Sequence, residues 1–216
     1  ELQDFIAVFD ASRVQGYALN STYPFAADLT WDEQRNASAQ IVRLSDGTAL
    51  KGANGTPVVR NRIQVVLVGI NGLYQNGYNT AEIAWQYQFS TVGFTSARIE
   101  AQMAAKNAAG KNWKAQYSTD GTTYTDIEGA AWTATANVVT NVAFDLPAAC
   151  VGQATVYVRF MSVGSEVFNK SYTFSKTAAD GMAYCDHSES GFGNLFVLGE
   201  AIVEADETAP VLLSTL

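Results

Sequence analysis

The sequence predicts an all-β fold, an antiparallel β-sandwich or barrel, from two observations. Short runs in which apolar and polar residues alternate recur along the 216 residues, and this two-residue period is typical of half-buried strands. Turn-forming pairs such as Asn71-Gly72 and Asp120-Gly121 separate some of these runs. Many short strands joined by turns are typical of sandwiches and barrels.

The expected strands follow one another along the whole chain. The first is an apolar run at residues 4–9, and the second is a β-branched run at residues 62–70. Alternating runs then predict strands at residues 83–89, 97–103, 113–117, 156–160 and 195–203. A polar turn is expected at residues 106–111, and a short helical turn at residues 34–39.

Aromatic residues in two of these strands are expected to share one core. Trp85, Tyr87 and Phe89 fall on one face of their strand, and Trp113 and Tyr117 fall on one face of theirs. Large aromatic side chains at such positions are more often buried than exposed. The two alternating faces therefore predict a shared interior.

A tight hairpin turn is expected at Asp120-Gly121. This pair lies between two alternating runs within residues 116–127, which is a strong local signal for a hairpin. Glycine tolerates the positive φ that such a turn requires. The pair therefore predicts a left-handed backbone at Gly121.

The composition limits the classes of partner. Hydrophobic residues make up 48% and aromatic residues 12% of the chain, as in globular proteins. The formal net charge is −8, so neither nucleic acid nor an anionic membrane surface is an expected partner. No apolar run reaches the roughly 18 residues that a membrane-spanning helix needs. The chain is therefore expected to be soluble, with no insertion into a membrane.

The scarcity of histidine and cysteine argues against catalysis. The chain has one histidine, His187, and two cysteines, and no triad motif or zinc-ligand spacing is present. A carboxylate-pair enzyme acting on glycans stays open, because any two of the 21 acidic residues could meet in space. A non-enzymatic role is the expectation.

Four segments resemble motifs of bacterial extracellular jelly-roll modules, which are similar to carbohydrate-binding and galactose-binding-like domains. The segments are FSTVGF (89–94), NWKAQYSTDGTTYTDI (112–127), FDLPAAC (144–150) and VYVRF (156–160). The resemblance implies a jelly-roll sandwich over residues 1–205, in a secreted or cell-surface protein of bacteria. The implied function is a non-catalytic module that binds a glycan, and the low charge of the chain suits a neutral glycan. A structural spacer or adhesion module without a small ligand is the alternative.

The last eleven residues, 206–216, resemble the opening of a bacterial immunoglobulin-like repeat. Their sequence, DETAPVLLSTL, follows an acidic stretch and contains a proline. The resemblance implies a linker at this point and a neighbouring immunoglobulin-like domain in the same chain.

Loop aromatics are the candidate ligand residues, because the strand aromatics are assigned to the core. Tyr74 and Tyr78 flank an expected turn that also contains Gln75 and Asn76. Rings offer a stacking face for a sugar, and amides supply hydrogen-bond donors and acceptors. Trp31, in another expected loop, is the next candidate. Partly buried loop aromatics with no ligand are the alternative.

Two further sites are possible on sequence grounds. An extracellular chain with two cysteines permits a disulfide between Cys150 and Cys185, with two reduced thiols as the alternative. Similar jelly rolls carry a structural calcium, for which Asp10 and the loop residue Asp186 are candidate ligands. Solvated acidic side chains are the alternative, and no other cofactor is expected.

Overall fold

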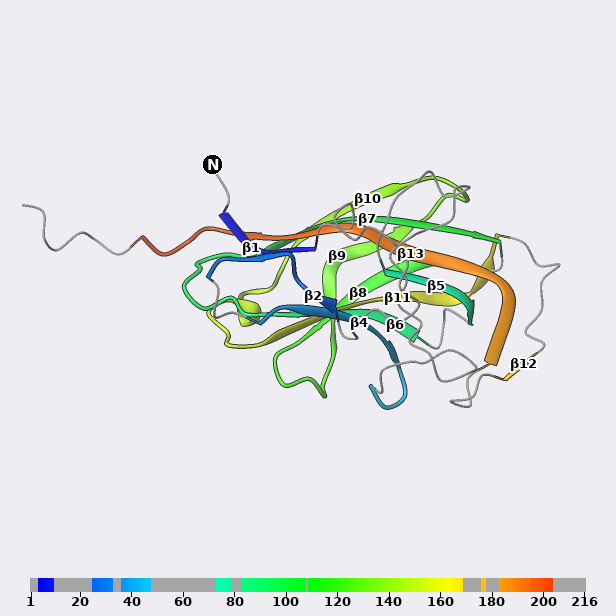
Figure 1. Ribbon diagram of the computed structural model, residues 1–216, viewed down its shortest axis with the longest axis horizontal. Helices are drawn as coiled ribbons and strands as arrows, with labels where there is room; N and C mark the ends of the chain where they lie inside the picture. Colours follow the sequence, from blue (N-terminus) through cyan, green and yellow to red (C-terminus); the bar gives the residue numbers. More distant parts are fainter. Residues whose placement is uncertain are drawn as a thin grey trace, which may run out of the picture.

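The computed structural model describes residues 4–9, 25–32, 36–47, 73–78, 83–107, 109–168, 176–177 and 183–203. These residues form two antiparallel β-sheets that pack face to face as two layers (Figure 1). The fold is therefore the predicted all-β sandwich of jelly-roll type. In this described part the one helical element is a short 3₁₀ turn, η3, at Ala148–Cys150. No helix there is long and apolar enough to cross a membrane.

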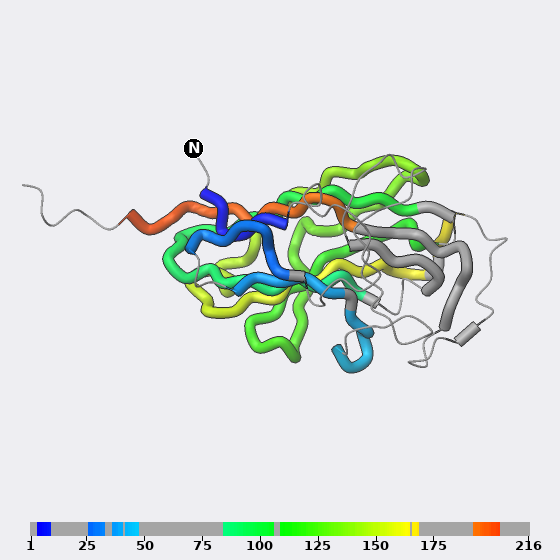
Figure 2. Tube along the Cα trace, viewed as in Figure 1, coloured from blue at the N-terminus to red at the C-terminus, as the bar shows by residue number. Residues whose placement is uncertain are grey.

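The first layer, called here the seven-stranded sheet, is built around the C-terminal strand. Its main order is β10 (Thr140–Asp145), β7 (Arg98–Asn107), β13 (Ala183–Gly199), β1 (Asp4–Phe9) and β3 (Leu29–Thr30). Two further strands pair with β13, namely β5 (Leu73–Tyr78) and β12 (Lys176–Thr177). The first described strand thus lies beside the last long strand, β13, as Figure 2 shows.

The second layer, called here the six-stranded sheet, carries the candidate site described below. Its order is β2 (Phe25–Ala26), β4 (Ser38–Arg43), β6 (Ile83–Phe89), β11 (Val156–Val167), β8 (Gly110–Ser118) and β9 (Thr125–Thr133). Strands β8 and β9 form a hairpin, while β11 lies between β6 and β8. The neighbours of β11 in this sheet therefore come from distant parts of the chain.

An aromatic core joins the two sheets. The ring centroids of Phe160 on β11 and Phe192 on β13 are 4.5 Å apart, and Phe192 also contacts Trp85 and Trp113. The indole N–H of Trp113 donates to the carbonyl of Gly110 over 2.9 Å, which satisfies its polar atom inside the core. Burying these side chains provides the main driving force for packing the layers.

The predicted core is confirmed. Four of its five aromatic residues are at most 1% exposed, and the fifth packs partly buried against the same cluster; they are Trp85, Tyr87, Phe89, Trp113 and, partly buried, Tyr117. The inward and outward faces that alternation predicts for β6 and β8 are therefore the observed ones.

Two of the resemblance segments meet at the end of the sandwich. The buried hydroxyl of Thr91, in the first segment, donates to the carbonyl of Cys150 over 2.5 Å. It also accepts the backbone N–H of Gln153 over 2.9 Å. Thr91 thereby connects the turn after β6 to η3 and to the segment that leads into β11.

Several expected boundaries are wrong or lie outside the described residues. The helical turn expected at residues 34–39 is wrong, because residues 38 and 39 begin strand β4, where Ala39 pairs with Tyr87 of β6. The turn expected at residues 106–111 is shorter, since β7 continues to Asn107 and β8 begins at Gly110. The strand expected at residues 62–70 lies outside the described residues.

The closing strand is much longer than expected. The prediction began it at residue 195, whereas β13 begins at Ala183 and ends at Gly199. Pairing with β7 on one side and with β5 on the other extends this strand through polar residues that read as a loop. The domain boundary expected near residue 205 stays a prediction.

Candidate functional site

The outer face of the six-stranded sheet carries one polar side chain on each of five neighbouring strands. Because the core aromatics of β6 and β8 point inward, the residues between them point outward. The register aligns Gln40 with Gln86, Gln86 with Arg159, Arg159 with Gln116, and Gln116 with Asp126. These residues, called the polar row, cross strands β4, β6, β11, β8 and β9 in that order.

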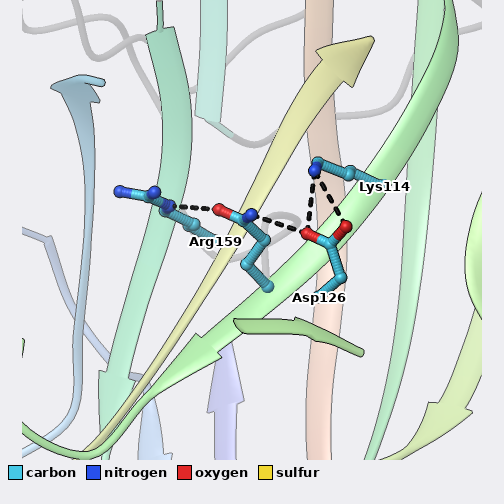
Figure 3. Close-up of polar contacts among 4 residues, drawn as sticks. Lys114, Asp126 and Arg159 are labelled. Atoms are coloured by element: carbon cyan, nitrogen blue, oxygen red, sulfur yellow. Dashed lines mark hydrogen bonds and ion pairs between the residues drawn. The ribbon is translucent and has the colours of Figure 1, made fainter. Parts of the chain in front are cut away.

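Hydrogen bonds connect the polar row from its centre to the edge strand. The Nε–H of Arg159 donates to Oε1 of Gln116 over 2.9 Å, and Nε2 of Gln116 donates to Oδ1 of Asp126 over 2.6 Å. Lys114 donates to both oxygens of Asp126, over 2.8 and 3.0 Å. Figure 3 shows these contacts as dashed lines and labels Lys114, Asp126 and Arg159. The side chains of Arg159, Gln116 and Asp126 are thus held in fixed orientations.

Tyr124 covers the centre of the polar row. The guanidinium carbon of Arg159 lies 3.5 Å from the centroid of its ring, a cation–π contact. The hydroxyl of Tyr124 donates to Oε1 of Gln86 over 2.8 Å, although Gln86 is two strands away from β8. This residue of the β8–β9 loop therefore bridges two members of the row.

The β8–β9 loop is shaped by its own polar contacts. Oδ1 of Asp120 accepts the backbone N–H groups of Thr122 and Thr123, each over 2.7 Å. The hydroxyl of Ser118 donates to Asp120 and accepts the N–H of Gly121. Gly121 has φ of +74°, as predicted, but the loop spans residues 119–124 and is longer than the expected tight turn.

These contacts and burial shift the pKa values of three side chains at the row. Hydrogen bonds from Lys114 and then Gln116 lower the pKa of Asp126, so this carboxyl stays ionised. Burial lowers the pKa of Arg159, and the nearby Tyr124 opposes that shift. Burial also raises the pKa of Tyr124, whose hydroxyl therefore stays protonated and able to donate. Arg159 and Asp126 are the charged members of the row, and Lys114 beside it pairs with Asp126.

The tyrosines predicted as ligand residues lie on the seven-stranded sheet, away from the polar row, and the prediction that they flank a turn is wrong. Residues 73–78 form strand β5, in which Tyr74 pairs with Gly191 and Tyr78 with Tyr184, both on β13. Gln75 and Asn76 pair with the neighbouring residues 190 and 189 of the same strand. This correction has a physical cause, because pairing with β13 overrides the local turn signal of the glycines. A ligand role for these four residues stays a prediction.

Trp31 is not brought together with β5. It is 46% exposed and packs its ring edge-to-face on Phe94, with centroids 5.2 Å apart. Its neighbour Thr30 pairs with Ala7 of β1, and Ala7 pairs in turn with Val197 of β13. Tyr74 pairs with Gly191 of the same strand. Six residues of β13 separate these two levels, which is about 20 Å along a strand.

The structure describes the residues of the cysteine and calcium predictions only in part. Cys150 is a buried free thiol in the structure, and the side chain of Cys185 lies outside the described part, so the bridge between them stays a prediction. Cys185 lies near the start of β13. Leu198, which pairs with the first residue of β7, lies near the other end of β13. Asp186 lies in β13 and not in the expected loop, and Asp10 lies outside the described residues. Calcium binding stays a prediction, and among the described residues no three acidic, histidine or cysteine side chains form a metal-binding group.

Comparisons with known proteins identify no family. No family model matches the chain, and no curated protein matches it. Among solved structures, the exo-β-1,3-galactanase of Phanerochaete chrysosporium has 12% identity and a TM-score of 0.35, over 91% of this chain and 29% of that one. The chain thus spans less than a third of that enzyme's length.

Two other solved structures are of similar size to this chain. The K2 cleaved adhesin domain of Lys-gingipain has 12% identity and a TM-score of 0.40, over 73% of this chain and 88% of that one. TmCBM61, solved in complex with β-1,4-galactotriose, has 8% identity and a TM-score of 0.32, over 78% of this chain and 90% of that one.

Proposed function

We propose that this domain is a non-catalytic glycan-binding module and that the polar row is its binding face. The observation that carries the proposal is the alignment of five planar polar groups across five strands. Amide, guanidinium and carboxylate groups supply the donors and acceptors that sugar hydroxyls require. A sheet face with such groups suits an extended oligosaccharide lying across the strands.

Aromatic rings next to the row add stacking surface. Tyr124 lies over Arg159, and Tyr157 occupies the outward position two residues earlier on β11. Both rings are partly buried, so each is fixed by its surroundings while part of it remains accessible. Tyrosine rings combine an apolar face with a polar tip, which suits a sugar ring and its hydroxyls.

The contacts within the row reduce the cost of binding. Arg159, Gln116 and Asp126 are already linked in the absence of ligand. A ligand therefore does not have to immobilise these long side chains, whose ordering costs about 0.5–1.5 kcal/mol each. Pre-organisation of this kind favours recognition of a hydrophilic ligand on an open face.

The chemistry of the row supports binding without catalysis. It contains one carboxylate, Asp126, whose lowered pKa keeps it ionised and unsuited to donate a proton. Hydrolysis of a glycosidic bond usually needs a second carboxyl group roughly 5–10 Å away. The polar row supplies none.

The cellular setting in this proposal is the one that the sequence resemblance implies. It is a secreted or cell-surface protein of bacteria with several domains, in which an immunoglobulin-like domain follows residue 205. The segments at residues 89–94 and 112–127 support this part of the proposal, and export of the parent protein would test it.

A spacer or adhesion role is the second candidate, favoured by apolar exposure on and near the seven-stranded sheet. Phe5 is 51% exposed and Leu29 is 55% exposed, on β1 and β3 respectively. Val203, just after the sandwich, is 89% exposed. Such side chains suit contact with another protein surface.

A matched pair of glutamine variants tests the proposed function. Gln116→Ala removes the link between Arg159 and Asp126 in the row, whereas Gln102→Ala removes an outward glutamine of β7 on the opposite sheet. A glycan array identifies a ligand for the wild type, and calorimetry then measures its affinity for both variants. We expect Gln116→Ala to weaken binding at least tenfold and Gln102→Ala to leave it unchanged.

Two results would contradict the proposal. Absence of wild-type binding to any glycan leaves the spacer or adhesion role as the better account. Undiminished binding in Gln116→Ala, together with loss in Tyr74→Ala or Tyr78→Ala, moves the site to β5. Thermal unfolding of each variant distinguishes loss of binding from loss of fold.

A further inference from the structure

Arg159 differs from the other arginines whose side chains the structure describes. Arg43 pairs with Asp46 over 3.1 Å, and Arg98 pairs with Asp145 over 2.8 Å and with Glu100 over 3.3 Å. No carboxylate of the described residues pairs with Arg159, although this side chain is partly buried at the middle of a sheet. A partly dehydrated cation without an anion is an unusual arrangement.

The pKa values follow the same contrast. Hydrogen bonds from Asp145 and Glu100 raise the pKa of Arg98, as expected for a guanidinium beside carboxylates. Burial instead lowers the pKa of Arg159, and only Tyr124 opposes it. The surroundings of Arg159 therefore lack the negative charge that would compensate its partial dehydration.

The geometry leaves one edge of the guanidinium available. Nε donates to Gln116 and the ring of Tyr124 covers one face, so both the position and the tilt of the group are fixed. In the described part of the chain, the Nη1 and Nη2 groups have no hydrogen-bond partner. Figure 3 shows this end of Arg159 directed away from Asp126. A fixed fork of N–H donors matches the two oxygens of a carboxylate.

No acidic side chain of the described residues compensates the charge of Arg159. Lys114 neutralises Asp126, which leaves the charge of Arg159 in excess within the row. The carboxylate of Asp120, in the loop that carries Tyr124, is held by the N–H groups of Thr122 and Thr123. The net charge of −8 acts over longer distances, and salt screens it beyond roughly 8 Å.

We infer that the free edge of Arg159 is a subsite for the carboxylate of an acidic sugar, such as a uronic acid within an oligosaccharide. The inference rests on the proposed function and narrows its ligand class. It replaces the neutral glycan that the low charge of the chain suggests. The uronate carboxylate accepts two hydrogen bonds from Arg159, while the row and its two tyrosines contact the hydroxyls and rings of adjoining sugars.

The test compares each acidic ligand with its own methyl ester. Oligogalacturonides and oligoglucuronides, as free acids and as methyl esters, have the same backbone and differ in the charge of the carboxyl group. We expect the wild type to bind one of the free acids at least tenfold more tightly than its ester. Arg159→Gln should abolish this preference, and Arg159→Lys should retain part of it, because lysine keeps the charge and loses the fork.

Arg98→Gln is the control, because it removes an arginine that already has carboxylate partners on the opposite sheet. Its preference for the free acid should equal that of the wild type. Equal affinity for acid and ester, or a preference that survives Arg159→Gln, overturns the inference and leaves the proposed function standing. Tighter binding of a sulfated oligosaccharide that contains no uronic acid overturns the assignment to a carboxylate. Absence of binding to every glycan overturns both proposals.

Discussion

The ring of Tyr124 lies 3.5 Å from the guanidinium carbon of Arg159, which couples a surface loop to the centre of a β-sheet. Tyr124 follows β8 in sequence, whereas Arg159 lies in the first half of β11, which runs between β6 and β8. The conformation of the β8–β9 loop therefore determines where the ring of Tyr124 lies over the polar row. Changes in this loop should affect both stability and the binding face.

Substitutions of Gly121 test the effect of the β8–β9 loop on stability. Its φ of +74° disfavours any side chain, and an added Cβ would lie 3.1 Å from Cε2 of Tyr157. We expect Gly121→Ala to lower the free energy of unfolding by about 1–2 kcal/mol for the left-handed backbone, and by more through the crowded contact. Gly121→Val should cost more again, because a β-branched residue fits this backbone poorly.

Gly129→Ala is the matched control for the backbone effect. Gly129 also has positive φ, +76°, but nothing lies within 4 Å of its added Cβ. Chemical denaturation should therefore show a smaller loss for Gly129→Ala than for Gly121→Ala. Equal losses would show that the Tyr157 contact has no energetic weight.

Asp120 should make the stability of the loop depend on acid. Hydrogen bonds from Thr123, Thr122 and Ser118 hold its pKa below the ordinary value of 3.8 in the folded chain. A lowered folded pKa means that the stabilisation is present above about pH 4 and is lost as the pH falls further. Asp120→Asn keeps an oxygen acceptor and removes the charge.

The wild type should therefore be more stable than Asp120→Asn at neutral pH, and the difference should shrink steadily as the pH falls below about 4. Urea unfolding at a series of pH values measures this difference. A difference that stays constant with pH would contradict the assigned role of the carboxylate.

Thr91 should be a strong stabilising residue despite its small size. Thr91→Val preserves shape and removes the hydroxyl, leaving the Cys150 carbonyl and the Gln153 N–H without this partner. The expected loss is about 1–3 kcal/mol in the free energy of unfolding. Thr95→Val, at an exposed position, should change it by less than about 0.5 kcal/mol. Similar values for the two variants would refute this account of the Thr91 contact.

Cys150 should be an unreactive thiol in the folded protein. Burial raises its pKa to about 11, so little thiolate is present near neutral pH. Alkylation should label it slowly under native conditions and rapidly after unfolding without reductant. Mass spectrometry that finds no label at Cys150 or Cys185 after such unfolding would instead support the predicted disulfide.

Much of the fold could be predicted from local sequence pattern. Alternation in β6 and β8 places Trp85 and Trp113 in the core because the two-residue period of a strand alone decides which face is buried. The positive φ at Gly121 follows from the Asp-Gly pair for a similarly local reason. These features depend on neighbours in sequence.

The missed features depend on partners far away in sequence. Strand β5 contains Asn76-Gly77, a turn signal, and it forms because residues 184–192 of β13 pair with it. The first half of β13 is polar and forms because β7 lies beside it. Pairing of this kind overrides local propensity.

The polar row could be predicted only in part. Alternation shows that Gln86, Gln116 and Arg159 face away from the core, but it does not show that they are neighbours. Their alignment requires the registers of β6 with β11 and of β11 with β8, which join segments more than forty residues apart. A single sequence contains no direct record of such registers.

Mapping the ligand contact by NMR tests the central claim most directly. The wild-type domain, labelled with ¹⁵N, is titrated with the oligosaccharide that binds best on the array. The account predicts shifts in the side-chain signals of Gln86, Gln116 and the Nε–H of Arg159, with those of Gln102 unchanged. Shifts confined to residues 73–78 of β5, with the polar row unaffected at saturation, would contradict it.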